Sequence, residues 1–241
     1  MKLSIVIPAF NEEKLLPATL TAVATAAAAL TESGIPHEVI VCDNNSADRT
    51  AAIAREHGAQ VIFEPVNQIG RARNTGATLA TGDWLLFLDA DSIPSRELFA
   101  DLAAALHDAG IFYGGCSVKL DVAHRAGTIL IGIWHSLARW LHYAAGSFLF
   151  VRREGFEATG GFSMEFYASE EVELSKRLKQ MARQRKQQFV FLTSHPLVTS
   201  ARKFRHYSGW WHLRFILRTA FCCTRNLRRR DSCGLWYDGK R

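Results

Sequence analysis

Short apolar runs alternate with segments of helical pattern over the first 110 residues of the chain. Four runs have the length and polar boundaries of strands buried on both faces, and they lie at residues 2–10, 37–43, 59–65 and 84–88. Helical patterns follow at 11–30, 44–58, 70–80 and 92–106, the first with Asn11 as its expected N-cap. Strands that alternate with helices in this way predict an α/β fold, with a doubly wound, mainly parallel sheet flanked by helices.

The pattern is less regular beyond Gly110. It predicts a helix with Trp and His residues at 131–146, a strand at 146–154, and a loop leading into a helix at 160–181. The longest apolar region, residues 126–151, contains two histidines and an arginine, which makes it a poor membrane span. Because the chain enters a strand at once, we expect no signal peptide and a cytoplasmic location.

Cysteine content and charge narrow the range of partners. Five cysteines without a C-x-x-C pair argue against a disulfide framework or a zinc site. The net charge of +6 is unevenly distributed, since residues 174–230 contain 15 Lys/Arg and no acidic residue, whereas residues 1–173 contain 12 Lys/Arg and 21 Asp/Glu. Such asymmetry indicates a nucleic acid, an anionic membrane or a phosphorylated substrate as partner, and the alternative is an ordinary cationic surface.

Polar residues follow three of the four predicted strands. They are Pro8 to Glu12 after the first, Asp43 to Ser46 after the second, and Asp89 to Asp91 after the fourth. These clusters share the carboxyl edge of the sheet, where open α/β sheets bind their ligands. A helix N-terminus can bind phosphate there and Asp43 can accept from a base or ribose, so we expect a pocket for a nucleotide diphosphate with its metal.

The aspartate pair is the candidate metal site. Asp89 and Asp91 are two residues apart, so in extended backbone both side chains leave on one side. Two hard oxygen ligands suit a Mg²⁺ or Mn²⁺ that also holds phosphate. Alternatively, one aspartate caps the next helix and the other is solvated. Arg71 and Arg73 can donate to the phosphates, unless they lie on a solvated helix face.

Four ordered blocks carry a resemblance to a known family. SIVIPAFNEE, EVIVCDNNSADRT, GRARNTGATLATGDWLLFLDADS and GGFSMEFYASEEVELSKRL span roughly residues 3–180 and closely resemble the family 2 glycosyltransferases with the GT-A fold. The resemblance implies an inverting transfer of a sugar from a nucleotide diphosphate donor, with Mn²⁺ or Mg²⁺ as cofactor. A UDP-sugar is the default donor, and the acceptor is a hydroxyl, including those of lipid-linked or cell-envelope glycans.

The resemblance also assigns roles to residues. The segment from Pro8 to Glu12 would border the nucleotide, Asp43 would contact the base or ribose, and Arg73 would approach the base or phosphates. Asp89 and Asp91 would form the DxD motif, with Asp91 as the direct metal ligand. Together with the arginines discussed below, the residues expected to contact the nucleotide sugar are Pro8, Ala9, Phe10, Glu12, Asp43, Arg71, Arg73, Asp89, Ala90, Arg202 and Arg205.

The family's catalytic base lies in an acidic pair, usually Glu-Asp, before a Val-x-Leu helix. This chain has Glu170 and Glu171 there, so we expect Glu171 to be the base and Glu170 to be the second choice. A single displacement needs one carboxylate to take the proton of the acceptor hydroxyl. Repulsion within the pair raises one pKa, while the helix dipole opposes the rise. The alternative is ordinary acidic residues in the first turn of a helix.

The chain departs from the family pattern at two places that bear on its charge and on its type of reaction. Asn44 stands where many relatives have a second aspartate, which removes a negative charge. The Q-x-x-R-W motif of processive members is replaced by SARKFRHYSGWW, so a polymer-extruding synthase is not expected. Arg202 and Arg205 in this segment are candidate clamps for the diphosphate, on one face if the segment is helical. His195 or His206 could complete a metal shell, although isolated histidines are more often structural.

The expected organisation is a catalytic domain at residues 1–200 and a basic, aromatic, helical extension at 201–241. Within the domain, residues of about 1–110 form the nucleotide and metal half and about 111–200 the acceptor half. The extension would either lie at the inner face of an anionic membrane, near a lipid-linked acceptor, or pack on the domain. The predicted helix at 131–146 would likewise either lie at a membrane or pack on the domain.

Two other functional classes are alternatives to a glycosyltransferase. A sugar-nucleotide nucleotidyltransferase would favour a Gly-rich phosphate loop with a basic residue after the first strand, whereas this chain has PAFNEE. A non-catalytic nucleic-acid-binding protein would use the basic part, but no helix-turn-helix, zinc finger or RNA-binding signature is visible. We therefore expect no nucleic-acid partner.

Overall fold

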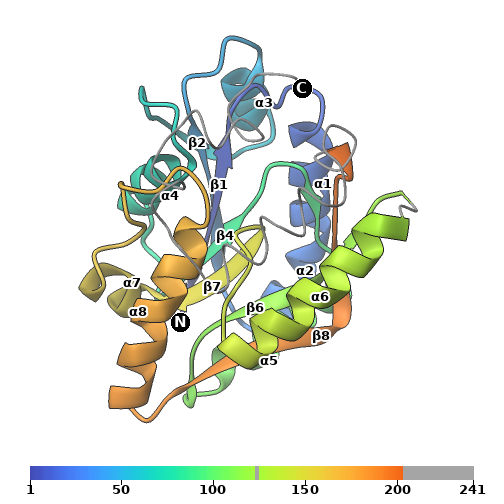
Figure 1. The fold of residues 1–241 in the computed structure, drawn as a ribbon. Helices are drawn as coiled ribbons and strands as arrows, with labels where there is room; N and C mark the ends of the chain where they lie inside the picture. The colour runs from blue at the N-terminus through green and yellow to red at the C-terminus, as the bar shows by residue number, and fades with distance from the viewer. Residues whose placement is uncertain (123–124, 203–241) are drawn as a thin grey trace.

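A single mixed sheet organises the computed structural model, which describes residues 1–122 and 125–202 (Figure 1). Its strand order is β3-β2-β1-β4-β7-β6-β8-β5. The strands are β1 (Leu3–Ala9), β2 (His37–Asp43), β3 (Gln60–Phe63), β4 (Trp84–Leu88), β5 (Ser92–Ile93), β6 (Ile111–Leu120), β7 (Phe148–Arg152) and β8 (Gln188–Thr199). The helices are α1 (Leu16–Ala26), α2 (Ala28–Glu32), α3 (Thr50–Glu56), α4 (Ile69–Thr78), α5 (Arg96–His107), α6 (Arg125–Leu141), α7 (Arg153–Ala158) and α8 (Glu170–Gln184).

The first four predicted strands are confirmed and form the parallel part of the sheet. β1 pairs in parallel with β2 and β4, and β2 with β3. Ile5 and Ile7 of β1 pack with α1, α2, α3 and α5 on one face, while Val6 packs with α4, α7 and α8 on the other. Burial on both faces explains why these strands are continuous apolar runs.

The second half of the chain completes the same sheet with mixed pairing. β7 lies antiparallel between β4 and β6, β6 pairs in parallel with β8, and β5 pairs antiparallel with β8. β8 has no counterpart among the strands predicted from the sequence. Its register with β6 jumps from Cys116↔Leu192 to Val118↔Leu197, and such a bulge breaks the two-residue alternation that identifies a strand.

The first helix begins later than predicted. α1 starts at Leu16, with Pro17 in its first turn, so Asn11 is not its N-cap. Asn11 instead adopts a left-handed φ of 53°, and its Oδ1 accepts from the backbone N of Ala47 at 2.8 Å. Its own N donates to Ser46 Oγ at 2.9 Å. Asn11 therefore ties the loop after β1 to the loop after β2.

The helix predicted at 131–146 corresponds to α6, which begins earlier, at Arg125, and ends at Leu141. Within the described part of the chain, no helix combines the length and the hydropathy that a membrane crossing requires. The expected helical extension at 201–241 lies outside the described residues apart from its first two.

Candidate active site

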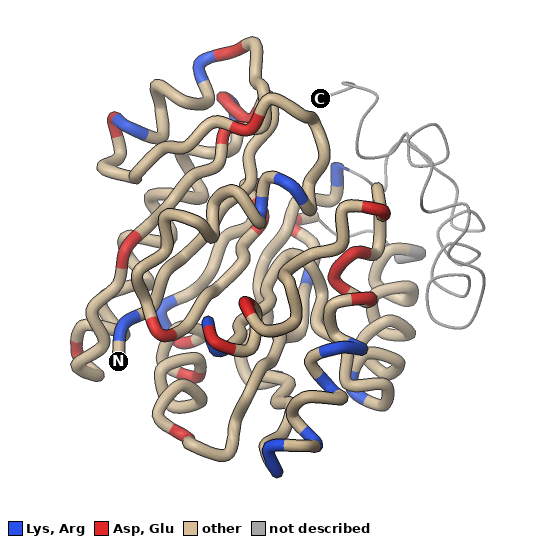
Figure 2. Tube along the Cα trace, turned by 90° about the vertical axis from the view of Figure 1, so that its left-hand side faces the viewer, with Lys and Arg blue, Asp and Glu red and all other residues tan. Residues whose placement is uncertain are grey.

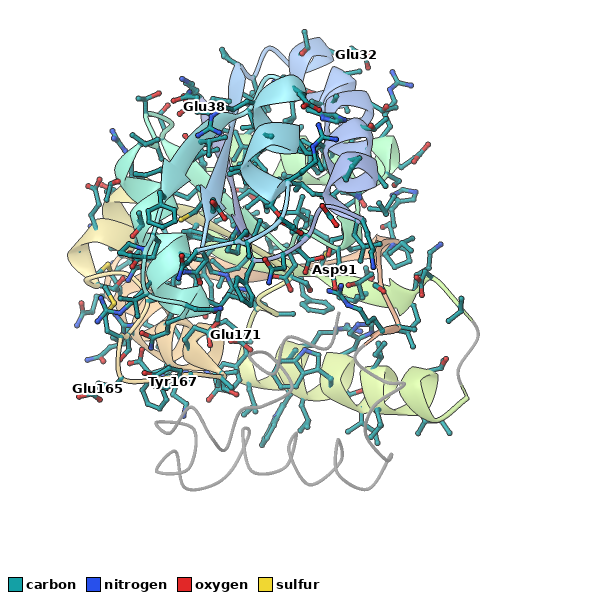
Figure 3. The ribbon with its side chains drawn as sticks, turned by 90° about the horizontal axis from the view of Figure 1, so that it is seen from above. Glu32, Glu38, Asp91, Glu165, Tyr167 and Glu171 are labelled. Atoms are coloured by element: carbon teal, nitrogen blue, oxygen red, sulfur yellow. The ribbon has the colours of Figure 1, made fainter. Side chains whose placement is uncertain are left out.

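Four acidic side chains and two arginines from distant parts of the chain meet at the carboxyl edge of the parallel strands. Figure 3 looks down on the molecule from above and shows Asp91 and Glu171 toward its middle. The acidic residues come from the loops after β1 and β4 and from the start of α8; they are Glu12, Asp89, Asp91 and Glu170, and the arginines are Arg73 and Arg202. They form two groups, each centred on one arginine.

The first group is centred on Arg73 of α4, whose side chain is only 2% exposed. Arg73 Nη2 donates to Asp89 Oδ1 and to the Gly146 carbonyl oxygen, both at 3.0 Å, and Nη1 donates to Glu170 Oε1. Burial acts to lower the pKa of Arg73, but the charges of Glu170 and Asp89 outweigh it and raise that pKa. Arg73 is thus a permanent cation that joins the aspartate motif to the acidic pair of α8.

The second group is centred on Arg202, which follows β8. Its guanidinium donates to both carboxylate oxygens of Glu12, at 2.9 and 3.3 Å, and approaches Asp91 Oδ2 at 3.5 Å. Glu12 and Asp91 are both buried, and Arg202, the last described residue, connects the loops after β1 and β4 that carry them. The sequence predicted Arg202 in the site but not these carboxylate partners.

Asp89 and Asp91 do not leave on one side, contrary to the expectation from extended backbone. Residues 90 and 91 form a turn in which Ser92 N donates to Asp89 O at 3.2 Å, and the two carboxylates diverge toward Arg73 and Arg202. The turn is held from α1, because Thr19 Oγ1 donates to Ala90 O at 2.8 Å. Neither aspartate caps α5, whose N-cap is Ser95 with its side chain accepting from Leu98 N.

Glu171 has a strongly raised pKa. Burial and the neighbouring charge of Glu170 raise its pKa to about 8, against the opposing effect of Arg73. Glu170 is bound by Arg73 and buried, whereas Glu171 is half-buried. Two adjacent carboxyl groups thus have different environments: Glu170 is paired with Arg73, and Glu171 is able to exchange a proton near neutral pH.

The nucleotide side of the site is built from the loops after β1 and β2. Asp43 is buried and accepts from Ser46 N at 3.0 Å. Pro8 and Ala9 end β1, paired with Cys42 and Asp43, and Phe10 follows half-buried. Arg71 Nε donates to Gln68 Oε1 at 2.9 Å. Arg205 and His206 lie outside the described residues.

Sequence reasoning missed the amides that hold this side together. Asn44 Nδ2 donates to the carbonyls of Glu64 and Val66, and its Oδ1 accepts from Gln68 N at 3.0 Å. Gln68 Nε2 in turn donates to Met164 O and Phe166 O, both at 2.8 Å. The only signal in the sequence was Asn44 in place of an aspartate, which the structure explains by the need for an amide donor.

The carboxylate and histidine side chains near this edge of the sheet are the candidate ligands of a divalent cation. Within residues 1–122 and 125–202, no three His, Cys, Asp or Glu side chains form a cluster that could hold a metal. His195 does not complete one, since its Nδ1 lies 2.9 Å from Asp101 Oδ2 on α5. Mg²⁺ is usually bound by one or two carboxylates plus substrate phosphates, so Asp91, with Glu12 beside it, fits a cation that arrives with a diphosphate.

Comparisons with known proteins identify the family of the chain. The sequence profile of Glycosyl transferase family 2 matches residues 4–160. An uncharacterized glycosyltransferase of Mycobacterium tuberculosis is 40% identical over 88 residues, which are 36% of this chain and 36% of that protein. The 4,4'-diaponeurosporenoate glycosyltransferase of Staphylococcus haemolyticus is 40% identical over 96 residues, 37% of this chain and 24% of that protein. The matches therefore span well under two thirds of these relatives.

Solved structures share the fold. S. aureus TarS 1-349 in complex with UDP-GlcNAc superposes with a TM-score of 0.66 at 19% identity, covering 91% of this chain and 66% of that one. Glucosyl-3-phosphoglycerate synthase from Mycobacterium tuberculosis, in complex with Mn²⁺, UDP-glucose and phosphoglyceric acid, gives 0.62 at 18% identity, covering 93% and 81%. With its GT-A fold and the profile match over most of its length, the chain belongs to glycosyl transferase family 2.

Proposed function

We propose that this protein transfers a sugar from a nucleoside diphosphate donor to an acceptor hydroxyl with inversion, with Glu171 as the general base. The observation that carries the proposal is the unequal acidic pair at the start of α8. Arg73 pairs with Glu170, and Glu171, with its raised pKa, is left to take a proton.

The reaction is a single displacement. The acceptor oxygen forms a bond to the anomeric carbon on the face opposite the diphosphate, while the bond from that carbon to the phosphate oxygen breaks. The hydroxyl proton passes to a Glu171 carboxylate oxygen, and the bonding electron pair leaves with the diphosphate. Arg202, released from Glu12 and Asp91, would donate to the departing phosphates.

Asp91 would hold Mn²⁺ or Mg²⁺, which neutralises charge on the diphosphate when bound. Asp43 would select the base or ribose of the nucleotide, with Pro8, Ala9 and Phe10 at the border of its pocket. UDP is the expected nucleotide, supported by the UDP-sugars in the TarS and glucosyl-3-phosphoglycerate synthase structures. The acceptor half is the part of the chain from about residue 111, and a lipid-linked or cell-envelope hydroxyl is the proposed acceptor class.

Calorimetric titration with UDP, GDP, dTDP and CDP, each with Mn²⁺ or with EDTA, tests the donor site. We expect one nucleotide to bind, only with Mn²⁺, and the Asp91→Asn variant to lose at least tenfold in affinity, because a metal-bound carboxylate becomes an amide. Asp83→Asn, at an exposed position, is the control and should bind as the wild type does. Failure of every diphosphate to bind with metal would contradict the proposal.

A further inference from the structure

The outward face of α6 is apolar. Ile129, Ile133 and Trp140 are 65%, 36% and 70% exposed, and their spacing of four and seven residues puts them on one face of the helix. Leu130 and Ala138 are buried. A helix with apolar residues on both its buried and its exposed face needs a second apolar environment.

A row of cations lies beside the C-terminal end of this helix. Lys176, Lys179 and Arg183 of α8 are three and four residues apart and share one helix face. Figure 2 shows acidic positions only at the N-terminal end of α8 and basic positions along the rest. The Lys179 ammonium donates to Leu141 O at 3.0 Å, which joins this row to the end of α6.

The charge of this row is not balanced locally. Within the described residues, no carboxylate lies within ion-pair distance of Lys176, Lys179 or Arg183, although Arg177 on the same helix and Arg185 just beyond its end pair with glutamates. Burial, together with the charges of Lys179 and Arg183, lowers the pKa of His142. The sequence has no acidic residue from 122 to 153, so α6 contributes none either.

We propose that α6 and the cationic row of α8 form a surface that binds an anionic lipid bilayer. The apolar stripe matches the acyl and headgroup boundary, with Trp140 at the level that tryptophan prefers, and the cations match the lipid charge. A protein partner would more often be met by charges of both signs at the rim of the patch. Figures 1 and 3 place both helices on the same side of the sheet.

The surface adjoins the candidate active site. α8 begins with Glu170 and Glu171, and Gly146, five residues beyond the end of α6, accepts from Arg73. Provided that the proposed function holds, binding here brings the base close to a membrane and favours an acceptor hydroxyl carried by a lipid. Bilayer binding itself does not depend on transfer and can be measured without a donor.

Co-sedimentation of the full chain with vesicles tests the proposal. We expect binding to vesicles of three parts phosphatidylcholine to one part phosphatidylglycerol at about 0.1 M salt, and weaker binding at higher salt or to pure phosphatidylcholine. The double change Lys176→Glu with Arg183→Glu should lower the affinity at least tenfold, and Trp140→Ser about tenfold. Matched controls on the far side of the sheet, Arg49→Glu and Phe63→Ser, should bind as the wild type does.

Three outcomes would overturn the proposal. The first is a wild-type chain that does not sediment with anionic vesicles. The second is binding that the α6 and α8 variants leave unchanged, which would assign it to another part of the chain. The third is a wild-type dimer in sedimentation velocity that Trp140→Ser converts to a monomer, which would identify a second copy as the occupant. UDP binding by each variant, measured in parallel, separates these outcomes from failure of the proposed function.

Discussion

At the scale of single residues, the acidic pair of α8 shows how environment divides roles between neighbours. Glu170 and Glu171 are adjacent and chemically identical, yet Arg73 contacts only Glu170 through hydrogen bonds. The result is one carboxylate paired with a buried guanidinium and one carboxyl group whose pKa is raised by burial and by its neighbour's charge. This division is what a base that works near neutral pH requires.

The pH dependence of transfer should follow Glu171. Because its pKa is raised to about 8, the carboxyl is protonated at lower pH, and the rate should increase as pH rises through this value. Glu171→Gln should lower the rate about 10²–10⁴-fold and remove this dependence, with donor binding retained. Initial rates of UDP release between pH 6 and 10 would check this, with Glu165→Gln as the control from the preceding exposed loop. An unchanged profile in Glu171→Gln would refute the assignment.

The same shift predicts an effect on stability. The folded state keeps a proton on Glu171 that the unfolded chain releases above the ordinary value of 4.5, so stability should fall as pH rises from there toward about 8. Glu171→Gln carries no such penalty and should be more stable than the wild type above pH 8. Urea unfolding midpoints of both proteins at neutral and at alkaline pH measure this difference.

Residue types at strand ends were predictable, but their partners were not. Asp43, Asp89 and Asp91 follow apolar runs, and topology alone places them at one edge. Arg73 donates hydrogen bonds to Asp89 and to Glu170, and Glu170 lies 97 positions further along the chain. These bonds depend on how closely α4 approaches α8. Such distances follow from packing between elements, which periodicity in one segment does not encode.

At the scale of elements, helix α4 positions the site through a close contact with β1. A Cβ placed on Gly76 would lie 2.5 Å from Val6 Cγ1, so only glycine permits this approach. Three residues earlier on the same helix, Arg73 reaches its carboxylate partners. The sequence predicted α4 and its neighbouring strands because their periodicity is regular, whereas β8 was missed because a bulge interrupts its pattern.

Substitution at Gly76 should therefore affect stability and activity together. Gly76→Ala should lower the free energy of unfolding by about 1–3 kcal/mol, since the helix has to move away from β1. The displacement of Arg73 should lower the transfer rate as well. Gly132→Ala, in α6 where no atom outside the neighbouring helix backbone lies within 4 Å of the added carbon, should leave activity unchanged and stabilise by about 0.5–1 kcal/mol. Equal effects of the two substitutions in urea unfolding would contradict this account of α4.

At the scale of the whole molecule, the last described residue contacts the loop that follows the first strand. β8 pairs with both β6 and β5 and ends beside the aspartate turn, where Ser200 N donates to Asp91 O at 3.2 Å. Two residues later, Arg202 joins Glu12 from the loop after β1 to Asp91 from the loop after β4. A donor phosphate and its metal would have to enter where Arg202 now pairs with Glu12 and Asp91.

The Arg202→Ala variant separates the two ligands of this site. Without the guanidinium, Arg202 no longer competes with a metal for Glu12 and Asp91 or repels it, so Mn²⁺ alone should bind more tightly than to the wild type, by about tenfold. UDP in the presence of Mn²⁺ should bind about tenfold or more weakly, because a charge-assisted donor to the phosphates is lost. Calorimetry with Mn²⁺ alone and with UDP plus Mn²⁺ measures both, and Arg49→Ala serves as an exposed control. If both affinities fell together, Arg202 would be holding the loops in place, and the exchange of guanidinium for metal at Asp91 would be wrong.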